Sequence, residues 1–196
     1  LFPETYALPR DATAEDLVLA MVRLFRQVFG EELRQEAGRR QMSVRDVVTL
    51  ASLIQKETGL DAERPLVSAV YTNRMGRRMP LQCDPTVIYA LQLAGAYDGN
   101  LTRDNLQFDS PYNTYRVGGI PPGPIASFGV AALDAVLFPE ETDFLLARCM
   151  AHCVLVQALD HTRHRGRLVV DRLCEARDIL KRHTVDFAGR RVHVAG

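Results

Sequence analysis

The chain has 196 residues, 47% of them hydrophobic, and its 24 basic and 24 acidic residues give a formal net charge of zero. This length suits one sizeable domain, or one domain with an appendage. A net charge of zero gives no electrostatic indication of binding to nucleic acid or to an anionic membrane. No run of about 18 apolar residues occurs, so the sequence predicts no membrane-spanning helix.

The sequence favours neither a disulfide framework nor a metal site. Its four cysteines show no CxxC pair and no zinc-ligand spacing: Cys83, Cys149, Cys153 and Cys174. His161 and His164 are three residues apart, but no acidic partner follows at ligand spacing, so we predict no metal. The chain begins at Leu1 rather than at a methionine and shows no signal peptide, so we expect it to be part of a longer protein.

Helical periodicity begins early in the chain. Thr13 precedes a segment, 14–29, whose apolar residues recur at helical spacing, and a threonine there can cap the helix. The charged segment 31–41 is expected to continue this helix, with Gly38 loosening it. We interpret both segments as scaffold with a solvated outer face.

The segment from Ser43 to Gly59 predicts a helix with both ends marked. Ser43 and Asp46 have capping-box spacing, and glycine is typical just after a helix end. Glu57 falls three residues after Ile54, so its carboxyl group lies at the edge of the apolar face. Loss of hydration there would raise its pKa and favour a general acid. A glutamate near a helix end is more often solvated or ion-paired, so the pattern alone leaves both interpretations open.

Further helices are predicted downstream. Segment 61–75 predicts a helix that starts near Arg64, because the proline that follows fits only a first turn. Asp84 before Pro85 is a typical start, which predicts a helix over 85–93 with Asp84 as its N-cap. Shorter helices are predicted over 102–106 and 127–137.

A long segment, 109–125, is rich in proline, glycine, asparagine and tyrosine. No helix or long strand fits it, so it is either a functional loop or disordered, and its aromatic residues favour order. Tyr112 and Tyr115 flank Asn113 and Thr114 and offer a polar, stacking surface of the kind that holds sugars. The same tyrosines would serve equally well as a lid over the core.

We expect the α+β fold class, a helix-rich domain with a small sheet. Its short strands are predicted near Leu81 and over 116–117, 145–147 and 154–156. Beyond about residue 145 the composition changes, because all five histidines lie there. We expect one domain over 1–162 and a divergent, unassigned tail over 163–196, with a helix over 168–180 and a short strand over 191–195.

A series of motifs occurs in order between residues 1 and 144: L-F-P-E-T-Y, L-A-S-L-I-Q-K-E-T, V-Y-T-N-R-M, M-P-L-Q-C-D-P-T-V-I-Y-A-L, S-P-Y-N-T-Y and G-I-P-P-G-P-I. Together they resemble the endolytic murein transglycosylase family (MltG, or YceG-like), which has an older label of aminodeoxychorismate lyase. Each motif alone is weak, but the ordered set is specific. The resemblance implies a YceG-like catalytic domain over 1–162, with the family's transmembrane helix and LysM-like region outside this chain.

The resemblance implies a peptidoglycan lytic transglycosylase. Such an enzyme cleaves the β-1,4 bond between N-acetylmuramic acid and N-acetylglucosamine and leaves 1,6-anhydro ends, with no cofactor and no metal. The family's catalytic glutamate falls on Glu57. For Asp84 we favour the helix-cap role over stabilisation of positive charge. The candidate substrate-binding residues are Gln82, Asp84, Tyr112, Asn113, Thr114 and Tyr115.

The same resemblance implies a location and partners. The parent protein is expected in the cytoplasmic (inner) membrane, with a single membrane pass and this domain on the extracytoplasmic side. The expected partners are peptidoglycan glycan strands and peptidoglycan synthases, beside which the enzyme would end nascent strands. No nucleic acid is expected as a partner.

The chain departs from the family pattern at several places. Cys83 stands where the family usually has serine or threonine, and 127–129 replaces an Asn-Pro-Gly turn. His152 and His161 keep the family's spacing of two histidines, but nothing beyond them matches. These departures leave open a non-catalytic glycan-binding or cell-wall-synthesis scaffold module, which would use the tyrosine loop equally well.

The older family label suggests a different enzyme, a pyridoxal-phosphate lyase. Such an enzyme needs a Schiff-base lysine and a phosphate cup. The chain has two lysines, Lys56 and Lys181, and Lys56 is predicted on the polar side of its helix. We therefore disfavour this alternative.

Overall fold

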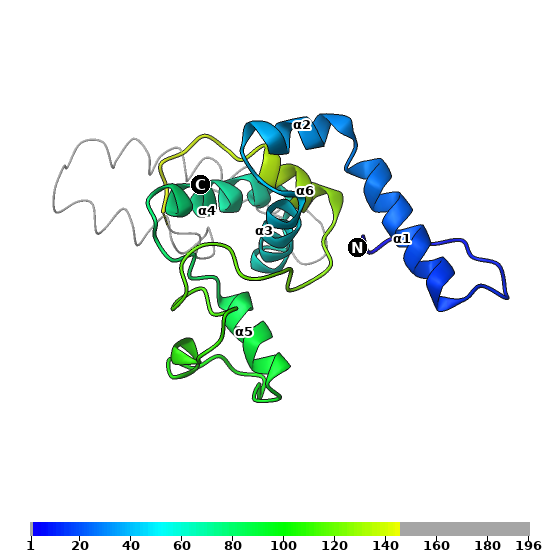
Figure 1. Ribbon diagram of the computed structural model, residues 1–196. Helices are drawn as coiled ribbons and strands as arrows, with labels where there is room; N and C mark the ends of the chain where they lie inside the picture. The colour runs from blue at the N-terminus through cyan, green and yellow to red at the C-terminus, as the bar shows by residue number, and fades with distance from the viewer. Residues whose placement is uncertain (1, 146–196) are drawn as a thin grey trace, which may run out of the picture. The chain divides into compact units, whose positions relative to one another are not determined.

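Within the unit Leu1–Leu145, the computed structural model describes residues 2–145 (Figure 1). Its elements in chain order are α1 (Ala14–Val28), α2 (Glu31–Arg39), α3 (Val44–Glu57), the 3-10 helix η1 (Asp61–Glu63), α4 (Arg64–Gly76), α5 (Asp84–Leu93), the 3-10 helix η2 (Asn105–Gln107) and α6 (Val130–Leu137). The predictions that fall on 146–196 lie outside the described residues: the strand over 145–147 beyond its first residue, the strand over 154–156, the boundary at 162, the tail elements and the histidine pairs.

The predicted α+β class is wrong for residues 2–145, which contain helices and loops but no β-strand. The expected strand over 116–117 is a turn instead, because the N–H groups of Arg116 and Val117 both donate to the carbonyl oxygen of Asn113, at 3.0 and 2.9 Å. A stretch that folds back on its own chain in this way has no N–H groups left for a neighbouring strand.

Near Leu81 the backbone makes one contact of the kind that a β-ladder would repeat. The Gln82 N–H donates to the carbonyl oxygen of Thr114 at 3.1 Å. The N–H of the adjacent residue, Cys83, donates to the Thr114 hydroxyl, and α5 begins at the next residue, Asp84. Gln82 itself has a φ of 54°, outside the extended region. The backbone pairing between this segment and Thr114 therefore consists of one hydrogen bond, and no strand forms.

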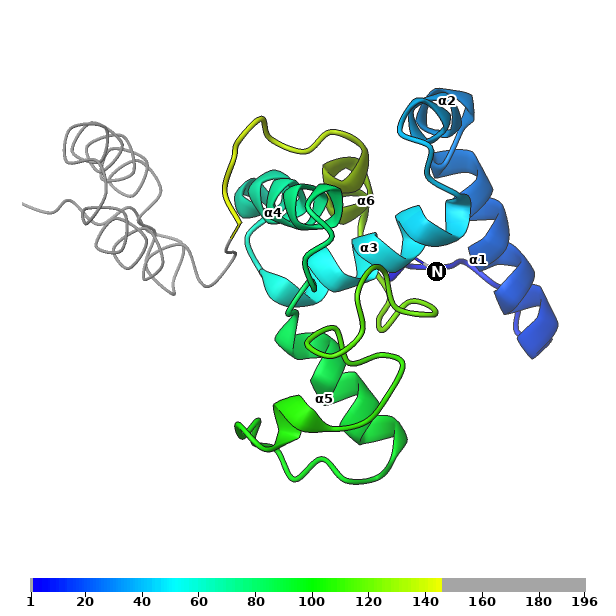
Figure 2. The same cartoon turned by 60° about the vertical axis from the view of Figure 1, so that its left-hand side comes forward.

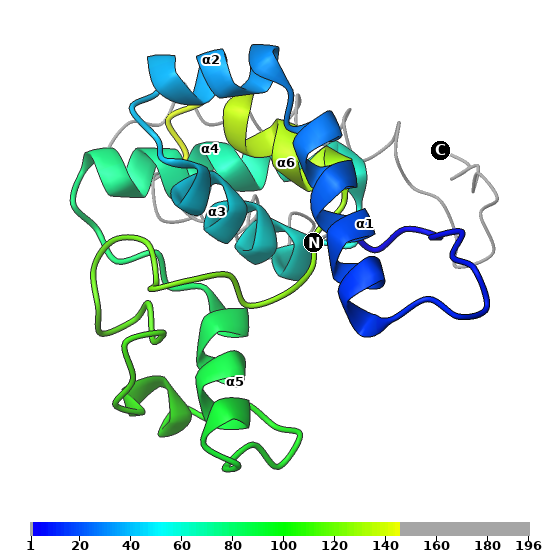
Figure 3. The same ribbon diagram turned by 45° about the vertical axis from the view of Figure 1, so that its right-hand side comes forward.

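Helix α3 is the centre of the unit. Its residues 49–54 are all buried, so every side of the helix at that level is covered. It packs against α4 and α6, and also contacts α2 and α5. Helices α2 and α5 lie on opposite sides of this central layer (Figures 1 and 3). The layer's fully buried side chains include Leu53, Ile54, Val70, Leu133 and Leu137.

Both ends of α3 are set by local chemistry. The predicted capping box is confirmed, since the Ser43 hydroxyl accepts from the Asp46 N–H at 3.2 Å and the Asp46 carboxylate accepts from the Ser43 N–H at 3.0 Å. At the other end Thr58 turns the chain extended, with φ −137° and ψ 140°. The helix thus stops directly after Glu57, without a left-handed glycine at 59.

Helix α1 is separate from α2, because the predicted continuous helix breaks at Phe29 and Gly30. Thr13 caps α1 as predicted, in a capping box with Asp16. No residue of α1 is buried. The helix is attached through packed phenylalanine rings: the centroid of the Phe2 ring lies 5.9 Å from that of Phe25 in α1 and 5.5 Å from that of Phe128. Among the described residues no helix is both long and apolar enough to cross a membrane.

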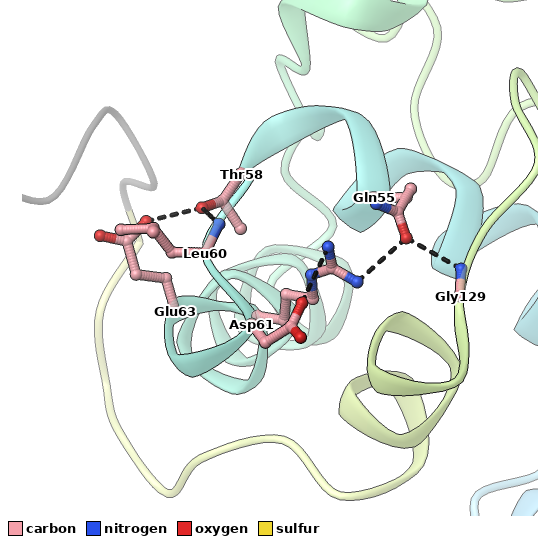
Figure 4. Close-up of polar contacts among 7 residues, drawn as sticks. Gln55, Thr58, Leu60, Asp61, Glu63 and Gly129 are labelled. Atoms are coloured by element: carbon pink, nitrogen blue, oxygen red, sulfur yellow. Dashed lines mark hydrogen bonds and ion pairs between the residues drawn. The ribbon is translucent and has the colours of Figure 1, made fainter. Parts of the chain in front are cut away.

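The connection between α3, α4 and α6 is fixed by side chains at the end of α3 (Figure 4). The Gln55 side-chain oxygen accepts from Arg64 at 3.0 Å and from the Gly129 N–H, before α6, at 2.9 Å. Arg64 also pairs with Asp61 at 3.0 Å. One amide thus joins three helices two residues before Glu57.

Thr58 closes the turn that follows (Figure 4). Its hydroxyl donates to the Glu63 carboxylate at 2.7 Å and accepts from the Leu60 N–H at 3.1 Å. The residue after Glu57 is therefore anchored, which limits the positions that the Glu57 side chain can take.

Candidate active site

Glu57 is the last residue of α3, whose end lies between α4 and α5 (Figure 2). Its side chain is partly buried. One carboxylate oxygen, Oε2, accepts a hydrogen bond from the Tyr71 hydroxyl of α4 at 3.2 Å and a weaker one from the Cys83 thiol at 3.5 Å. Three parts of the chain therefore meet at this carboxyl group.

The surroundings of Glu57 favour its protonated form. Burial raises the pKa of Glu57, and the nearby negative charge of Asp84 raises it further. Hydrogen bonds from Cys83 and Tyr71 and the positive charge of Arg74 oppose this shift, but the net result is a raised pKa. The desolvation predicted from the helix pattern is therefore present at this carboxyl group.

The two donors to Glu57 are themselves deeply buried, with Tyr71 2% and Cys83 0% exposed. Burial raises the pKa of the Tyr71 hydroxyl and of the Cys83 thiol well above their usual ranges. Both groups consequently keep their protons and act as donors at every pH at which Glu57 changes its charge.

The position of Cys83 is fixed by two threonines. Its N–H donates to the Thr114 hydroxyl at 2.9 Å, and its carbonyl oxygen accepts from the Thr86 hydroxyl at 2.7 Å. The two hydroxyl groups also lie 2.8 Å apart, within hydrogen-bond distance. Thr114 is only 1% exposed, and it acts on Glu57 indirectly, because it holds the backbone of Cys83, whose thiol contacts Glu57.

Removal of the Thr114 hydroxyl should loosen this arrangement. Thr114→Val keeps the shape of the side chain but leaves the buried Cys83 N–H without its acceptor. We expect a loss of about 1–3 kcal/mol in the free energy of unfolding, measured by urea denaturation. The control is Thr72→Val on the exposed face of α4, which should be close to neutral. Equal stability of the two variants would contradict this role of Thr114.

Asn113 organises the loop in a similar way. Its side chain is buried, and its amide donates to the carbonyl oxygens of Leu106 and Phe108 at 3.0 and 2.7 Å. Its oxygen accepts from the Tyr115 N–H at 3.0 Å. The predicted direct contacts of Asn113 and Thr114 with substrate stay predictions, and their burial favours a role in shaping the loop.

Asp84 lies one position later than predicted. It is the first residue of α5, Cys83 occupies the N-cap position, and no side chain caps the helix. The prediction that Asp84 caps this helix is therefore wrong. Its carboxylate instead accepts a hydrogen bond from the Tyr115 hydroxyl. Since Asp84 also raises the pKa of Glu57, the site holds two carboxyl groups within electrostatic reach of each other.

Gln82 is exposed and is held at the site by Arg74. One nitrogen of the Arg74 guanidinium, Nη1, donates to the Gln82 side-chain oxygen at 3.0 Å. The same nitrogen donates to the carbonyl oxygens of Pro80 and Leu81 at 3.0 and 2.8 Å. Arg74, itself 4% exposed, therefore fixes the segment that leads into Cys83.

Tyr112 is partly buried and packs edge-on against Tyr89 of α5, with ring centroids 4.9 Å apart. Its hydroxyl lies close to Gly123, where an added Cβ would sit 3.4 Å away. The tyrosine segment is thus packed onto α5 and is an ordered loop, as its aromatic residues predicted. Whether Tyr112 and Tyr115 stack on a sugar stays a prediction.

Sequence reasoning identified Glu57 but missed the residues that surround it. Tyr71 and Arg74 both fall within the helix predicted over 61–75, but the sequence predicted no role for either at this site. A signal was present, because a buried tyrosine usually finds a partner for its hydroxyl group. The partner lies 14 residues away on another helix, so only the tertiary structure identifies it.

The fold and the site define a helical domain built around one protonatable carboxyl group at the end of a buried helix. The chain belongs to the YceG-like family, whose model matches residues 1–147.

Named relatives agree with this family. The chain is 36% identical over 173 residues to the endolytic murein transglycosylase of Bacillus subtilis strain 168, a match that covers 86% of this chain and 47% of the relative. It is 30% identical over 148 residues to the endolytic murein transglycosylase of Streptococcus pneumoniae serotype 2, covering 74% of this chain and 26% of the relative. The chain thus spans about half the length of the Bacillus relative and about a quarter of the length of the Streptococcus relative.

A solved structure is also similar. The crystal structure of a YceG-like protein from Listeria monocytogenes matches with a TM-score of 0.67 and 38% sequence identity. The match covers 74% of this chain and 47% of the Listeria chain. The helical architecture described above is therefore that of a YceG-like fold.

Proposed function

We propose that this domain is a peptidoglycan lytic transglycosylase that cleaves the bond between N-acetylmuramic acid and N-acetylglucosamine and leaves 1,6-anhydro ends. The observation that carries the proposal is the carboxyl group of Glu57, whose pKa is raised by burial and which two donors hold at a fixed place. The names of the Bacillus and Streptococcus relatives support the choice of substrate.

In the first step Glu57 acts as the general acid. Its proton passes to the bridging oxygen while the bond from that oxygen to the muramyl C1 breaks, and the electron pair stays on the oxygen. The sugar left behind carries positive charge over C1 and its ring oxygen. The carboxylate of Asp84, on the first residue of α5, would stabilise this charge, and its electrostatic effect on Glu57 supports this role.

In the second step the muramyl 6-hydroxyl oxygen bonds to C1 and closes the anhydro ring. The hydroxyl proton passes to the carboxylate of Glu57, which regains the form in which it started. No water is consumed. Glu57 gives up one proton in the first step and takes one back in the second, so a single carboxyl group serves both as acid and as base. A site that desolvates Glu57 favours the protonated form required at the start.

Other residues of the site are proposed to bind the glycan. Gln82 is exposed beside Cys83, and Tyr112 and Tyr115 lie on the loop that covers α5. Asn113 and Thr114 are buried, and they would support glycan binding indirectly, by fixing the conformation of that loop.

The pyridoxal-phosphate alternative gains no support from the described residues. Lys56 is exposed on the surface of α3. Lys181 lies outside the described residues.

For location and partners the proposal rests on the family resemblance alone. We propose a parent protein with one pass through the inner membrane and this domain on the extracytoplasmic side. There it would end nascent glycan strands beside the peptidoglycan synthases. A reporter enzyme fused after this domain, active only outside the cytoplasm, tests the orientation, and a cytoplasmic signal would contradict it.

The mass of the products tests the proposed reaction. Purified uncrosslinked glycan strands are digested with the domain, and the fragments are analysed by mass spectrometry. We expect fragments that are lighter by one water than hydrolysis products. Fragments of hydrolysis mass would instead indicate a muramidase, with Asp84 as the first residue to test for water activation. Binding without cleavage would support the glycan-binding module.

A further inference from the structure

The two oxygens of the Glu57 carboxyl group have different surroundings. We propose that Tyr71 and Cys83 are positioning residues that hold Oε2 as the carbonyl oxygen of protonated Glu57, so that Oε1 carries and delivers the proton. This inference rests on the proposed function for its catalytic meaning. The assignment of the proton to one oxygen can be tested on the free protein.

Among the described residues, the hydrogen bonds to the Glu57 carboxyl group are all on one of its oxygens. Both the Tyr71 hydroxyl and the Cys83 thiol contact Oε2, at 3.2 and 3.5 Å. Among residues 2–145 no donor contacts Oε1. An oxygen that accepts two hydrogen bonds is a poor place for a further proton, because its lone pairs are already engaged. The proton of the neutral acid is therefore expected on Oε1.

Both donors are rigidly placed. Tyr71 is buried within α4, and its hydroxyl reaches Glu57 across the interface between α3 and α4. Cys83 is held through its backbone by Thr86 and Thr114. With two fixed donors on Oε2, rotation of the carboxyl group by half a turn would break both hydrogen bonds. The acidic oxygen thus keeps one direction, as a general acid requires.

The same donors act in the second half of the reaction. Once Oε1 has lost its proton, the negative charge is stabilised by the hydrogen bonds to Oε2, and Oε1 remains open to the proton of the 6-hydroxyl group. The charged groups that also face Glu57 are Asp84 of α5, which favours the neutral form, and Arg74 of α4, which favours the ionised form. Removal of a donor to Oε2 therefore favours the neutral form.

Infrared spectroscopy of the 196-residue chain tests the proton's position. Subtraction of the Glu57→Gln spectrum identifies the carbonyl stretch of protonated Glu57. Hydrogen bonds to a carbonyl oxygen lower its stretching frequency, so Tyr71→Phe should move this band to higher wavenumber and its titration to higher pH. Tyr97→Phe, which removes a surface hydroxyl bonded to the carbonyl oxygen of Gly99, is the matched control and should change neither.

Cys83 offers a second, conservative variant. Cys83→Ser replaces a weak thiol donor with a stronger hydroxyl donor, so the Glu57 band should move to lower wavenumber and its titration to lower pH. Cys83→Ala should move both in the opposite direction. A band that stays in place in Tyr71→Phe and in both Cys83 variants would place the proton on Oε2 and overturn the proposal.

Kinetics on glycan strands link this geometry to catalysis. For Tyr71→Phe we expect kcat to fall about ten- to hundredfold with little change in KM, because the acid is less well directed. The alkaline limb of the pH–rate profile should move to higher pH. A fall in activity with an unshifted profile would reduce Tyr71 to a structural role and overturn the proposal.

The two proposals fail separately. If the wild-type chain cleaves no glycan, the proposed function fails, yet the infrared band and its titration still decide which oxygen holds the proton. If cleavage occurs and the band does not respond to Tyr71 or Cys83, the function stands and this inference falls.

Discussion

Glu57→Gln is expected to remove glycan cleavage, with kcat lower by about a thousandfold. The amide keeps the size of the side chain and can still accept from the Tyr71 hydroxyl, but it has no acidic proton to give to the bridging oxygen. The measurement is the rate of release of anhydro-ended fragments from uncrosslinked glycan strands. The matched control is Glu32→Gln on the exposed face of α2, which should keep full activity.

The stability of the same variant separates lost chemistry from lost folding. Folding raises the pKa of Glu57, so the native state binds this proton more tightly than the unfolded state. As the pH rises from the pKa of Glu57 in the unfolded state to its higher pKa in the folded state, ionisation of this group progressively lowers the free energy of unfolding. Above the folded-state pKa the full destabilisation applies. Glu57→Gln should match the wild type at low pH and exceed its stability in urea denaturation at pH 8.

An inactive but equally or more stable Glu57→Gln variant assigns the glutamate to catalysis. If this variant cleaves glycan at the wild-type rate while folded, the assignment of Glu57 as the acid is wrong. Asp84, the neighbouring carboxylate, would then be the residue to replace next.

Arg74→Met is expected to cause the largest loss of stability, about 3 kcal/mol or more in the free energy of unfolding. The guanidinium is almost completely buried, and it donates to the carbonyl oxygens of Pro80, Leu81 and Leu145 as well as to the Gln82 side chain. Methionine fills similar space but leaves these acceptors without a donor. Urea denaturation measures the difference.

The neighbouring Arg77 provides the control, because its side chain is exposed at the end of α4. Arg77→Met should change stability little. Arg74→Lys should fall between, since an ammonium group keeps the charge but cannot spread its donors over several acceptors. If Arg74→Met and Arg77→Met unfold alike, the proposed role of Arg74 in holding 80–82 is wrong.

Arg74→Met should also affect the acid. Its positive charge lowers the pKa of Glu57, so its removal should raise that pKa further. In the variant, activity should therefore persist to higher pH while its maximum falls, because Gln82 and the segment before Cys83 lose their anchor.

The local features of the chain were determined by its sequence alone. Ser43 and Asp46 lie three residues apart, and the capping box that begins α3 involves only these neighbours. Helical spacing alone placed Glu57 at the edge of an apolar face, and the order of the motifs placed the chain in its family. Interactions over three or four residues form in nearly the same way whatever the rest of the fold does.

The tertiary structure decided what depends on partners far apart in the chain. Leu81 was predicted in a strand, but the backbone pairing with Thr114 ends at the Gln82 N–H, because Gln82 has a positive φ and α5 begins at Asp84. Asp84 was predicted as a cap, but its carboxylate turns to the Tyr115 hydroxyl, 31 residues away. The local conformation at such positions depends on which partners the buried polar groups find. Tertiary packing brings those partners together.

The same distinction applies to the site. Sequence pattern marked Glu57 as a desolvated carboxyl group, because desolvation follows from its place on one helix, and the family resemblance proposed it as the acid. The pattern did not identify Tyr71, Cys83 or Arg74 as the groups that lower the pKa of Glu57 against the effect of burial, because they come from other elements. A short-range pattern can mark a carboxyl group as desolvated, whereas its hydrogen bonds, and hence the oxygen that carries the proton, depend on how α3, α4 and α5 pack.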